Sequence, residues 1–329
     1  MISIIIPTYN SASKLRQLLS SIYLISVDRE KIETIVVDDC STDETQIFIK
    51  EFSHVEYIKL ENRSGPAFAR NIGAKKAKGE ILLFTDADTV FLPETLSNTR
   101  RVLADNPDIK CIIGNYEKVP ANAGFIPRYK ALWEYSEEVR MLRSGDMQYT
   151  SFAPRPGIIY KDVFLETGGF NTAFKKADVE DMEFGYWVNM KHEIIFSPDI
   201  KIKHHYPETF IKEIRPFARR CFFYSRLLLS RKKLDRAGEA NAINALADIS
   251  GFGSFIALGF FFIPYNFVVF FLLFILFIWF SLNFCVVVLK EENWMFLAKA
   301  VFTRYIHTIV MGFSVTFSIL TLPFFKEKY

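Results

Sequence analysis

The feature that most constrains this chain is an apolar stretch of 41 residues, 249–289, that contains no Asp, Glu, Lys or Arg. As one helix it would be about 60 Å long, roughly twice the hydrocarbon thickness of a bilayer, so it must bend. Residues 264–266, Pro-Tyr-Asn, are the natural break. We expect residues 249–263 to lie in the membrane interface and residues 267–289 to form a full-length span.

A second uncharged stretch, residues 305–325, is expected to be another span. Residues 201–236 hold eleven Lys or Arg against three acidic residues, a local charge of +8 in a chain whose total is +3. Under the positive-inside rule this basic segment and the charged front part, residues 1–248, lie in the cytoplasm. The segment contacts anionic membrane lipids or is an ordinary solvated helix. The chain is thus expected to be an integral membrane protein with two crossings.

Composition excludes several classes of protein. A net charge of +3, from 40 basic and 37 acidic residues, gives no overall field to attract nucleic acid. Four scattered cysteines without a CxxC pair exclude a zinc knuckle and a disulfide framework. The apolar run at residues 2–7 lacks the basic region and cleavage site of a signal peptide. No GxGxxG follows a predicted strand, which excludes a Rossmann dehydrogenase.

The front part predicts an α/β fold. Apolar runs rich in β-branched residues alternate with helix-like stretches, the runs at residues 2–6, 34–37, 55–60 and 81–85 and the helices at residues 14–25, 44–52 and 67–77. This alternation is typical of βαβ units in a doubly wound, mostly parallel sheet. Ligands of such sheets bind at the carboxyl ends of the strands, so the residues that follow each run are the candidate site.

Polar residues follow the predicted strands at that edge. Asp38 and Asp39 come directly after the second strand, and Asp43 is suited to capping the next helix. Asp86 and Asp88 follow the fourth strand, and side chains at i and i+2 of an extended segment project to the same side. The two carboxylates can therefore converge on one hard cation or one ligand.

The order of these motifs resembles family 2 glycosyltransferases with the GT-A fold. The resemblance rests on residues 3–10, SIIIPTYN, residues 35–43, IVVDDCSTD, the pair Arg70-Asn71 and the triplet Asp86-Ala87-Asp88. Further along, Gly168-Gly169-Phe170, Glu180-Asp181 and His204-His205 look like the acceptor half of that family. The resemblance implies a nucleotide-sugar half at residues 1–115 and an acceptor half at residues 116–210. A basic amphipathic membrane-surface segment, 211–248, and a transmembrane region, 249–329, are expected to follow.

On the donor side, the resemblance implies that Pro7, Thr8 and Tyr9 line the nucleotide pocket. It implies that Asp38 accepts a hydrogen bond from the donor base, and that Asp39 contacts the ribose or supports that loop. UDP is favoured as the nucleotide, and GDP stays possible.

The resemblance also implies a divalent cation, Mg²⁺ or Mn²⁺, that neutralises the diphosphate. Asp86 and Asp88 match the metal-binding DXD motif, Asp86 also lies near the donor, and Arg70 adds positive charge there. Either His204 or His205 is a candidate third ligand, or both are solvated surface residues. Adjacent strand residues point to opposite faces, so at most one is expected to bind the metal.

Asp181 matches the general base of the family, and Glu180 flanks it. The alternative is that these carboxylates form an acidic helix start stabilised by the helix dipole. Gly168, Gly169 and Trp187 are expected on the acceptor side, although relatives often carry Arg at the position of Trp187. The QxxRW motif of processive synthases is absent, so transfer of a single sugar is expected.

The resemblance and the membrane tail together predict an inverting, metal-dependent transfer of one sugar from a nucleotide-diphosphate sugar to a membrane-associated hydroxyl acceptor. The expected acceptor is a lipid-linked saccharide in cell-envelope or glycoconjugate biosynthesis. One alternative is a polyprenyl-phosphate acceptor, which ionises without a base. Another is a non-catalytic membrane subunit that binds a nucleotide sugar.

Overall fold

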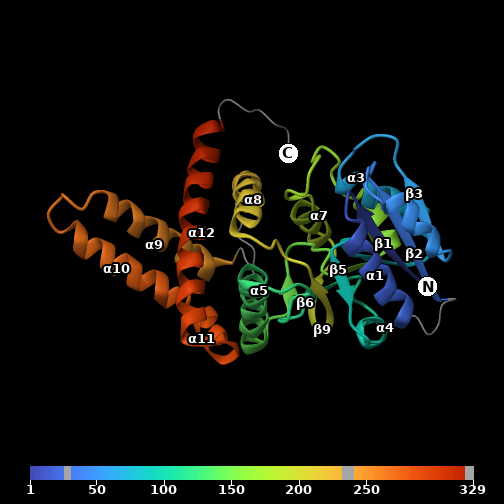
Figure 1. Ribbon diagram of the computed structural model, residues 1–329, viewed down its shortest axis with the longest axis horizontal. Coiled ribbons are helices and arrows are strands. Elements are labelled where there is room, and N and C mark those ends of the chain that lie inside the picture. Colours follow the sequence, from blue (N-terminus) through green and yellow to red (C-terminus); the bar gives the residue numbers. More distant parts are fainter. Residues whose placement is uncertain (26–30, 232–240, 323–329) are drawn as a thin grey trace. The chain divides into compact units, whose positions relative to one another are not determined.

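The computed structural model describes residues 1–25, 31–231 and 241–322 (Figure 1). It divides into two compact units, Met1–Ala123 with Gly145–Tyr206, and Gly124–Ser144 with Pro207–Tyr329. Residues 124–144, which the sequence placed within the acceptor half, belong to the second unit. Residues 232–236 of the basic segment and residues 323–329 lie outside the described residues.

The first unit is built on a nine-stranded sheet with the strand order β3-β2-β1-β4-β8-β6-β9-β5, in which β7 also pairs with β9. The strands are β1 (Ile2–Thr8), β2 (Ile32–Asp38), β3 (Val55–Lys59), β4 (Ile81–Phe84), β5 (Thr89–Phe91), β6 (Cys111–Tyr116), β7 (Gln148–Tyr149), β8 (Gly157–Tyr160) and β9 (Ile194–His204). The first four are parallel neighbours, whereas β8 runs antiparallel to β4 and β6. The predicted strands of the front part are confirmed.

Helices connect these strands as expected for βαβ units. They are α1 (Ala12–Ile25), α2 (Thr45–Phe48), α3 (Pro66–Lys76), α4 (Thr95–Asp105), α6 (Lys161–Glu166) and α7 (Glu180–Asn189). The predicted helix at residues 44–52 consists of α2 and one 3₁₀ turn, Ile49–Glu51. Crossovers between parallel strands are right-handed. Because β2 and β3 lie on one side of β1 and β4 lies on the other side, α1 and α3 cover opposite faces of the sheet. The α/β class is confirmed.

A cluster of five phenylalanines fixes α7 to the sheet of the first unit. Its members are Phe84, Phe152, Phe164, Phe170 and Phe184, with neighbouring ring centroids 4.6 to 5.8 Å apart. Gly185 follows Phe184 on α7, and a Cβ at that position would collide with the backbone nitrogen of Phe152. Close packing of this kind leaves α7 little freedom, so the residues at its start have a defined place.

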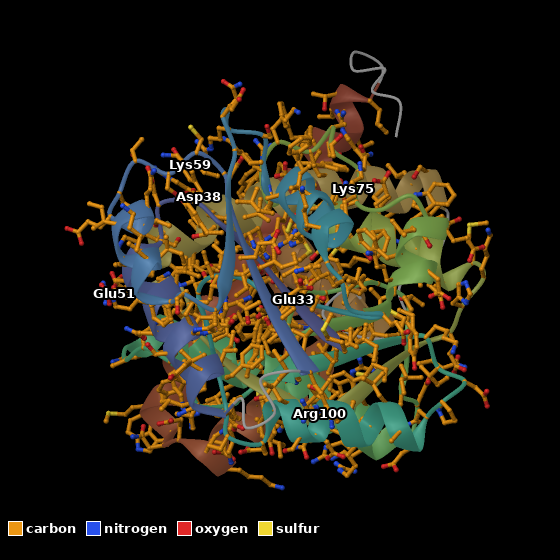
Figure 2. The ribbon with its side chains drawn as sticks, turned by 90° about the vertical axis from the view of Figure 1, so that its right-hand side faces the viewer. Glu33, Asp38, Glu51, Lys59, Lys75 and Arg100 are labelled. Carbon is orange, nitrogen blue, oxygen red and sulfur yellow. The ribbon has the colours of Figure 1, made fainter. Side chains whose placement is uncertain are left out.

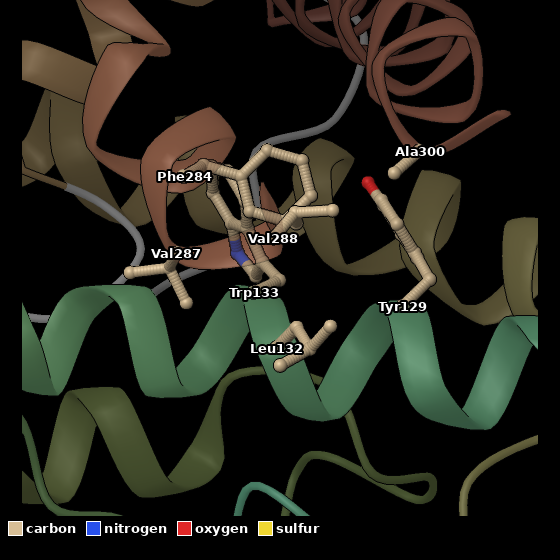
Figure 3. Packing of buried hydrophobic residues seen from close by; sticks show 7 residues of the cluster. All are labelled: Tyr129, Leu132, Trp133, Phe284, Val287, Val288 and Ala300. Carbon is tan, nitrogen blue, oxygen red and sulfur yellow. The ribbon is translucent and has the colours of Figure 1, made fainter. Parts of the chain in front are cut away.

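The second unit consists of helices: α5 (Phe125–Ser144), α8 (Phe210–Arg231), α9 (Ala242–Gly259), α10 (Asn266–Phe280), α11 (Leu282–Glu291) and α12 (Trp294–Thr321). Figure 1 shows α9 and α10 side by side as a hairpin, and α12 packs against α8 and α9. Figure 3 shows one apolar cluster of this unit, in which side chains of α5 face α11 and Ala300 of α12. The cluster contains Tyr129, Leu132, Trp133, Phe284, Val287, Val288 and Ala300.

The predicted break in the long apolar stretch is confirmed, because α9 ends at Gly259 and α10 begins at Asn266. The span predicted at residues 267–289 is not one straight helix, because its two helices, α10 and α11, meet at a bend of 59°. Together the two helices are long and apolar enough for one broken span. The bend lies at Ser281, where the backbone N–H donates to the carbonyls of both Phe277 and Ile278.

Judged by length and apolar composition alone, one continuous helix in the described part of the chain can cross a membrane, and it is α9. The sequence placed residues 249–263 in the interface, because the basic segment and the terminal basic residues would then share the cytoplasm. The helix starts earlier, at Ala242, and includes Asp248, whose carboxylate pairs with Arg304 at 2.5 Å. The span predicted at residues 305–325 is not a separate apolar helix, since α12 begins at Trp294 and buries Arg304 and His307.

Candidate functional site

The carboxyl ends of the parallel strands carry the predicted donor residues. In Figure 2 Asp38, the last residue of β2, lies near its β3 neighbour Lys59, away from Glu33 at the other end of β2. Thr8 ends β1, and its buried Oγ1 has no hydrogen-bond partner among the described residues. An unpaired buried hydroxyl at this edge is available to a ligand.

Pro7 lies within β1, and Tyr9 follows that strand. The guanidinium of Arg63 stands 3.9 Å from the centroid of the Tyr9 ring. The Tyr9 ring thus already stacks against a planar group, the Arg63 guanidinium. A nucleotide base is also planar, and the sequence predicts the nucleotide at this place.

Asp38 is completely buried and both of its carboxylate oxygens have protein partners. Oδ1 accepts from the Ser41 N–H at 2.8 Å, and Oδ2 accepts from the Tyr57 hydroxyl at 2.5 Å. Burial and this carboxylate raise the pKa of Tyr57, which keeps the phenol protonated as the donor. The role of Asp38 at the donor base stays a prediction.

Asp39 holds the loop after β3. Its two oxygens accept from the backbone N–H groups of Ser64 at 2.6 Å and Gly65 at 2.9 Å. Gly65 has a φ of +93°, and a Cβ there would lie 2.8 Å from the carbonyl oxygen of Lys175, so only glycine fits. Of the two sequence-based roles for Asp39, these bonds agree with loop support.

Asp43 caps two helices rather than one. It accepts from the Thr45 N–H and hydroxyl at the start of α2, and its other oxygen accepts from the N–H of Ala12, the first residue of α1. The capping role that the sequence predicted is confirmed.

Arg70 joins the two acidic motifs. One guanidinium nitrogen donates to Asp86 Oδ1 at 2.7 Å, and the other donates to Glu180 Oε1 at 3.0 Å. Arg70 and Glu180 are both buried, and the second oxygen of Glu180 accepts from the Asp178 N–H. The end of β4 and the start of α7 are thereby brought to one site.

Asp181 stands at the second position of α7, beside Glu180. Burial and the Glu180 carboxylate raise the pKa of Asp181 to about 7, although Arg70 and the N–H of Met182 oppose the shift. A carboxylate with this pKa exchanges a proton readily near neutral pH, as a general base must. The role of Asp181 as the general base stays a prediction.

Asp88 and His204 face each other, with His204 Nε2 at 3.3 Å from Asp88 Oδ1. The imidazole is stacked on Tyr116 at 4.5 Å and meets the edge of Tyr206, so its orientation is fixed. His205 turns elsewhere, to Gln17 Oε1 at 2.9 Å. The structure thus brings the imidazole of His204, but not that of His205, to the carboxylate of Asp88.

No group of three His, Cys, Asp or Glu side chains within the described ranges is arranged to hold a metal ion. The donor atoms nevertheless suit Mg²⁺ or Mn²⁺, since Asp88 offers carboxylate oxygens beside the His204 imidazole. The buried Nδ1 of His204 has no hydrogen-bond partner among the residues that the structure describes. Asp86, by contrast, is turned toward Arg70.

The acceptor-side residues lie around α7 and the loop before it. Gly168 and Gly169 both have positive φ, and Asn71 clamps the segment by accepting from the Phe170 N–H and donating to the Phe170 carbonyl. Trp187 lies on α7, about 120° around the helix axis from Asp181, and is 49% exposed. The structure therefore gives Trp187 no contact with Asp181.

Two contacts of the site were missed in the sequence. Tyr57, the partner of Asp38, is one apolar-looking residue in an edge strand, and only the register of β2 with β3 indicates its role. Lys14, in the first turn of α1, lies 3.8 Å from Asp88 Oδ2, and a single lysine at the start of a helix carried no signal of this contact.

With this geometry in view, the comparisons identify the family. The model of glycosyl transferase family 2 matches residues 3–177, more than half of the chain, and the chain belongs to this family. A solved mannosyltransferase of Pyrobaculum calidifontis, in complex with GDP-Man and Mn²⁺, aligns with a TM-score of 0.59. The alignment covers 99% of this chain and 88% of that one at 19% identity, so it supports the GT-A fold alone.

Among curated proteins, an uncharacterised glycosyltransferase of Haemophilus influenzae is 33% identical over 188 residues, which are 56% of this chain and 60% of that protein. The poly(ribitol-phosphate) β-N-acetylglucosaminyltransferase TarS of Staphylococcus aureus is 37% identical over 55% of this chain and 31% of its own length. The Escherichia coli enzyme WfgD, a UDP-Glc:α-D-GlcNAc-diphosphoundecaprenol β-1,3-glucosyltransferase, is 30% identical over 37% and 48%. The chain thus spans less than two thirds of each of these relatives.

Proposed function

We propose that this chain transfers a single sugar, with inversion, from a nucleotide-diphosphate sugar to a hydroxyl group of a membrane-associated, lipid-linked saccharide. The observation that carries the proposal is the Arg70 bridge, which puts Asp86 of the DXD motif and the Glu180-Asp181 pair in one site. A leaving-group motif and a candidate base in one site are what an in-line displacement needs.

Each side chain then has a task. Asp181, with its raised pKa, accepts the proton of the attacking hydroxyl. Asp88 and His204, with Asp86, would hold the divalent cation, which supplies charge stabilisation for the departing nucleoside diphosphate. Thr8 and Tyr9 would bind the nucleotide, with UDP favoured over GDP.

The hydroxyl acceptor is favoured over a lipid phosphate by Asp181. A phosphate nucleophile is already ionised and needs no base, so a carboxylate with a pKa near neutrality would have no task there. The names of TarS and WfgD, which describe transfer to poly(ribitol-phosphate) and to a sugar on diphosphoundecaprenol, support a role in cell-envelope biosynthesis.

The second unit is proposed to associate with the membrane through the α9–α10 hairpin. Its tip exposes Phe261 at 72%, Phe262 at 69% and Tyr265 at 84%, and residues 249–289 carry no charge. Such an uncharged, aromatic surface suits lipid better than water. The catalytic unit is proposed to face the cytoplasm, on the basis of the basic segment.

The donor and the acceptor are tested together with the detergent-purified full chain, Mn²⁺, a total lipid extract, and a scan of UDP- and GDP-sugars. Wild type is compared with Asp181→Asn and Asp88→Asn. Lipid-dependent nucleotide release that both substitutions abolish supports the proposal. Loss with Asp88→Asn alone indicates a lipid-phosphate acceptor, and nucleotide binding without any release indicates a non-catalytic subunit.

The membrane proposal has its own test, flotation of the full chain with liposomes made from the same lipids. The double variant Phe261→Asp, Phe262→Asp should remain at the bottom of the gradient if the hairpin tip enters the bilayer. Equal flotation of the variant and the wild type would contradict this use of the hairpin.

A further inference from the structure

Lys14 stands in the first turn of α1, and its Nζ lies 3.8 Å from Asp88 Oδ2. The other oxygen of Asp88 faces His204 at 3.3 Å. The other carboxylate of the DXD motif, that of Asp86, is paired with Arg70. Both carboxylates of the motif therefore already face cationic or imidazole groups of the protein itself.

The fold holds Lys14 in this place. The start of α1 is tied to Asp43 through the Ala12 N–H, and Gln17, one helical turn after Lys14, binds His205. The N–H of His205 in turn donates to the carbonyl of Asp88 at 2.8 Å. The helix face that carries Lys14 and the turn that carries Asp88 are thus linked by contacts that do not involve the Lys14 ammonium.

Lys14 is nevertheless able to move its charge. Its side chain is 41% exposed, and a lysine ammonium is a compact point charge on a flexible stem. A cation that binds Asp88 through Oδ2 must displace this ammonium. The diphosphate that arrives with the donor offers the displaced ammonium a new anionic partner.

We propose that Lys14 neutralises Asp88 in the free enzyme and moves to the donor diphosphate when a divalent cation takes its place on Asp88. The inference rests on the proposed function, because it needs a nucleotide-diphosphate donor. It makes Lys14 a further donor-binding residue. It also predicts that the metal and the nucleotide bind cooperatively, each raising the affinity for the other by the same factor.

The test measures Mn²⁺ binding by electron paramagnetic resonance of the detergent-purified full chain, without acceptor. Titrations are made alone and with saturating UDP, and a parallel series uses GDP. The variants are Lys14→Met, Lys14→Arg, which keeps the charge, and Lys75→Met, an exposed lysine at the end of α3 that serves as the control.

Without nucleotide, Lys14→Met should bind Mn²⁺ roughly three- to fivefold more tightly than the wild type, the upper part of the range for a part-exposed ion pair. The gain in Mn²⁺ affinity on adding nucleotide should shrink by at least the same factor, whereas Lys14→Arg and Lys75→Met should behave like the wild type. Unchanged or weaker Mn²⁺ binding by Lys14→Met, or an unchanged nucleotide effect, would overturn the inference.

The two proposals fail in different ways. A wild type that binds neither UDP nor GDP, with or without Mn²⁺, removes the proposed donor and the Lys14 inference with it. A wild type that binds nucleotide and Mn²⁺ cooperatively, with the same cooperativity in Lys14→Met, removes only the inference.

Discussion

Glu180 lies 110 residues beyond Arg70 in the sequence, yet its Oε1 accepts a hydrogen bond from the Arg70 guanidinium at 3.0 Å. Both side chains are buried, so neither charge is shared with bulk water. The pair fixes the start of α7, and with it Asp181, relative to the end of β4, where Arg70 also binds Asp86. The proposed base and the carboxylate of Asp86 are therefore held in one place by a single guanidinium.

Removing this guanidinium should destabilise the protein strongly. Arg70→Gln leaves Glu180 as a buried carboxylate without its cation, which costs about 3–5 kcal/mol in comparable cases. Urea unfolding should show this loss. Arg101→Gln is the matched control, because Arg101 pairs with the exposed Asp199 and should contribute at most about 1 kcal/mol. Equal midpoints for the two variants would argue against a buried bridge.

The rate of transfer should rise with pH through about 7. Asp181 must be deprotonated to accept a proton, and its pKa is raised to about 7, so the active form accumulates as the pH increases through that value. The measurement is kcat/KM for transfer between pH 5 and 9. A rate that is flat over this range would indicate that no such base takes part.

The stability of the fold should change with pH in the opposite direction. Asp181 has a higher pKa in the folded chain than its unfolded value of about 3.9, so the folded state binds more protons and loses stability as the pH rises from about 4 to 7. Asp181→Asn has no such titration. Relative to the wild type, the variant should therefore be about 4 kcal/mol more stable at pH 8 than at pH 4. Melting temperatures that differ by the same amount at both pH values would contradict the raised pKa.

Much of this site could be predicted from the sequence, because each motif is local. The run before Asp86 forms β4, and the parallel pairing of β1 with β2 and β4 brings Thr8, Asp38 and Asp86 to one edge of the sheet. Alternating strands and helices are sufficient for that conclusion, since right-handed crossovers leave few other topologies.

What the sequence did not indicate are the contacts between distant motifs. The register of β2 with β3 decides that Tyr57 reaches Asp38, and a register cannot be read from one strand alone. The helix bounds in the apolar tail could not be read from the sequence for a related reason. The charge of Asp248 is paired with Arg304, so α9 can begin before the uncharged stretch and include Asp248. A count of uncharged residues cannot detect this pairing.

The two adjacent histidines should differ in their effect on metal binding. His204→Ala removes the imidazole beside Asp88 and should weaken Mn²⁺ binding in the presence of UDP at least about tenfold. His205→Ala removes a contact with Gln17 and should change the Mn²⁺ affinity much less. Electron paramagnetic resonance of both variants checks the assignment, and the reverse order of effects would refute it.

Gly185 should tolerate no side chain. A methyl group there would collide with the backbone of Phe152, and backbone cannot rotate away as a side chain can, so Gly185→Ala should lose at least about 3 kcal/mol of stability. Gly259→Ala is the control, since nothing lies within 4 Å of its added Cβ. Thermal unfolding of both variants decides the point, and a Gly185→Ala protein as stable as the wild type would contradict the packing of α7.

The most direct test of the central claim is the comparison of nucleotide binding and sugar transfer in Asp181→Asn. If Asp181 is the base for a hydroxyl acceptor, the variant should bind the nucleotide with a Kd within about twofold of the wild type, yet transfer sugar to the lipid acceptor roughly 10²- to 10⁴-fold more slowly. Transfer by Asp181→Asn at the rate of the wild type would contradict the account.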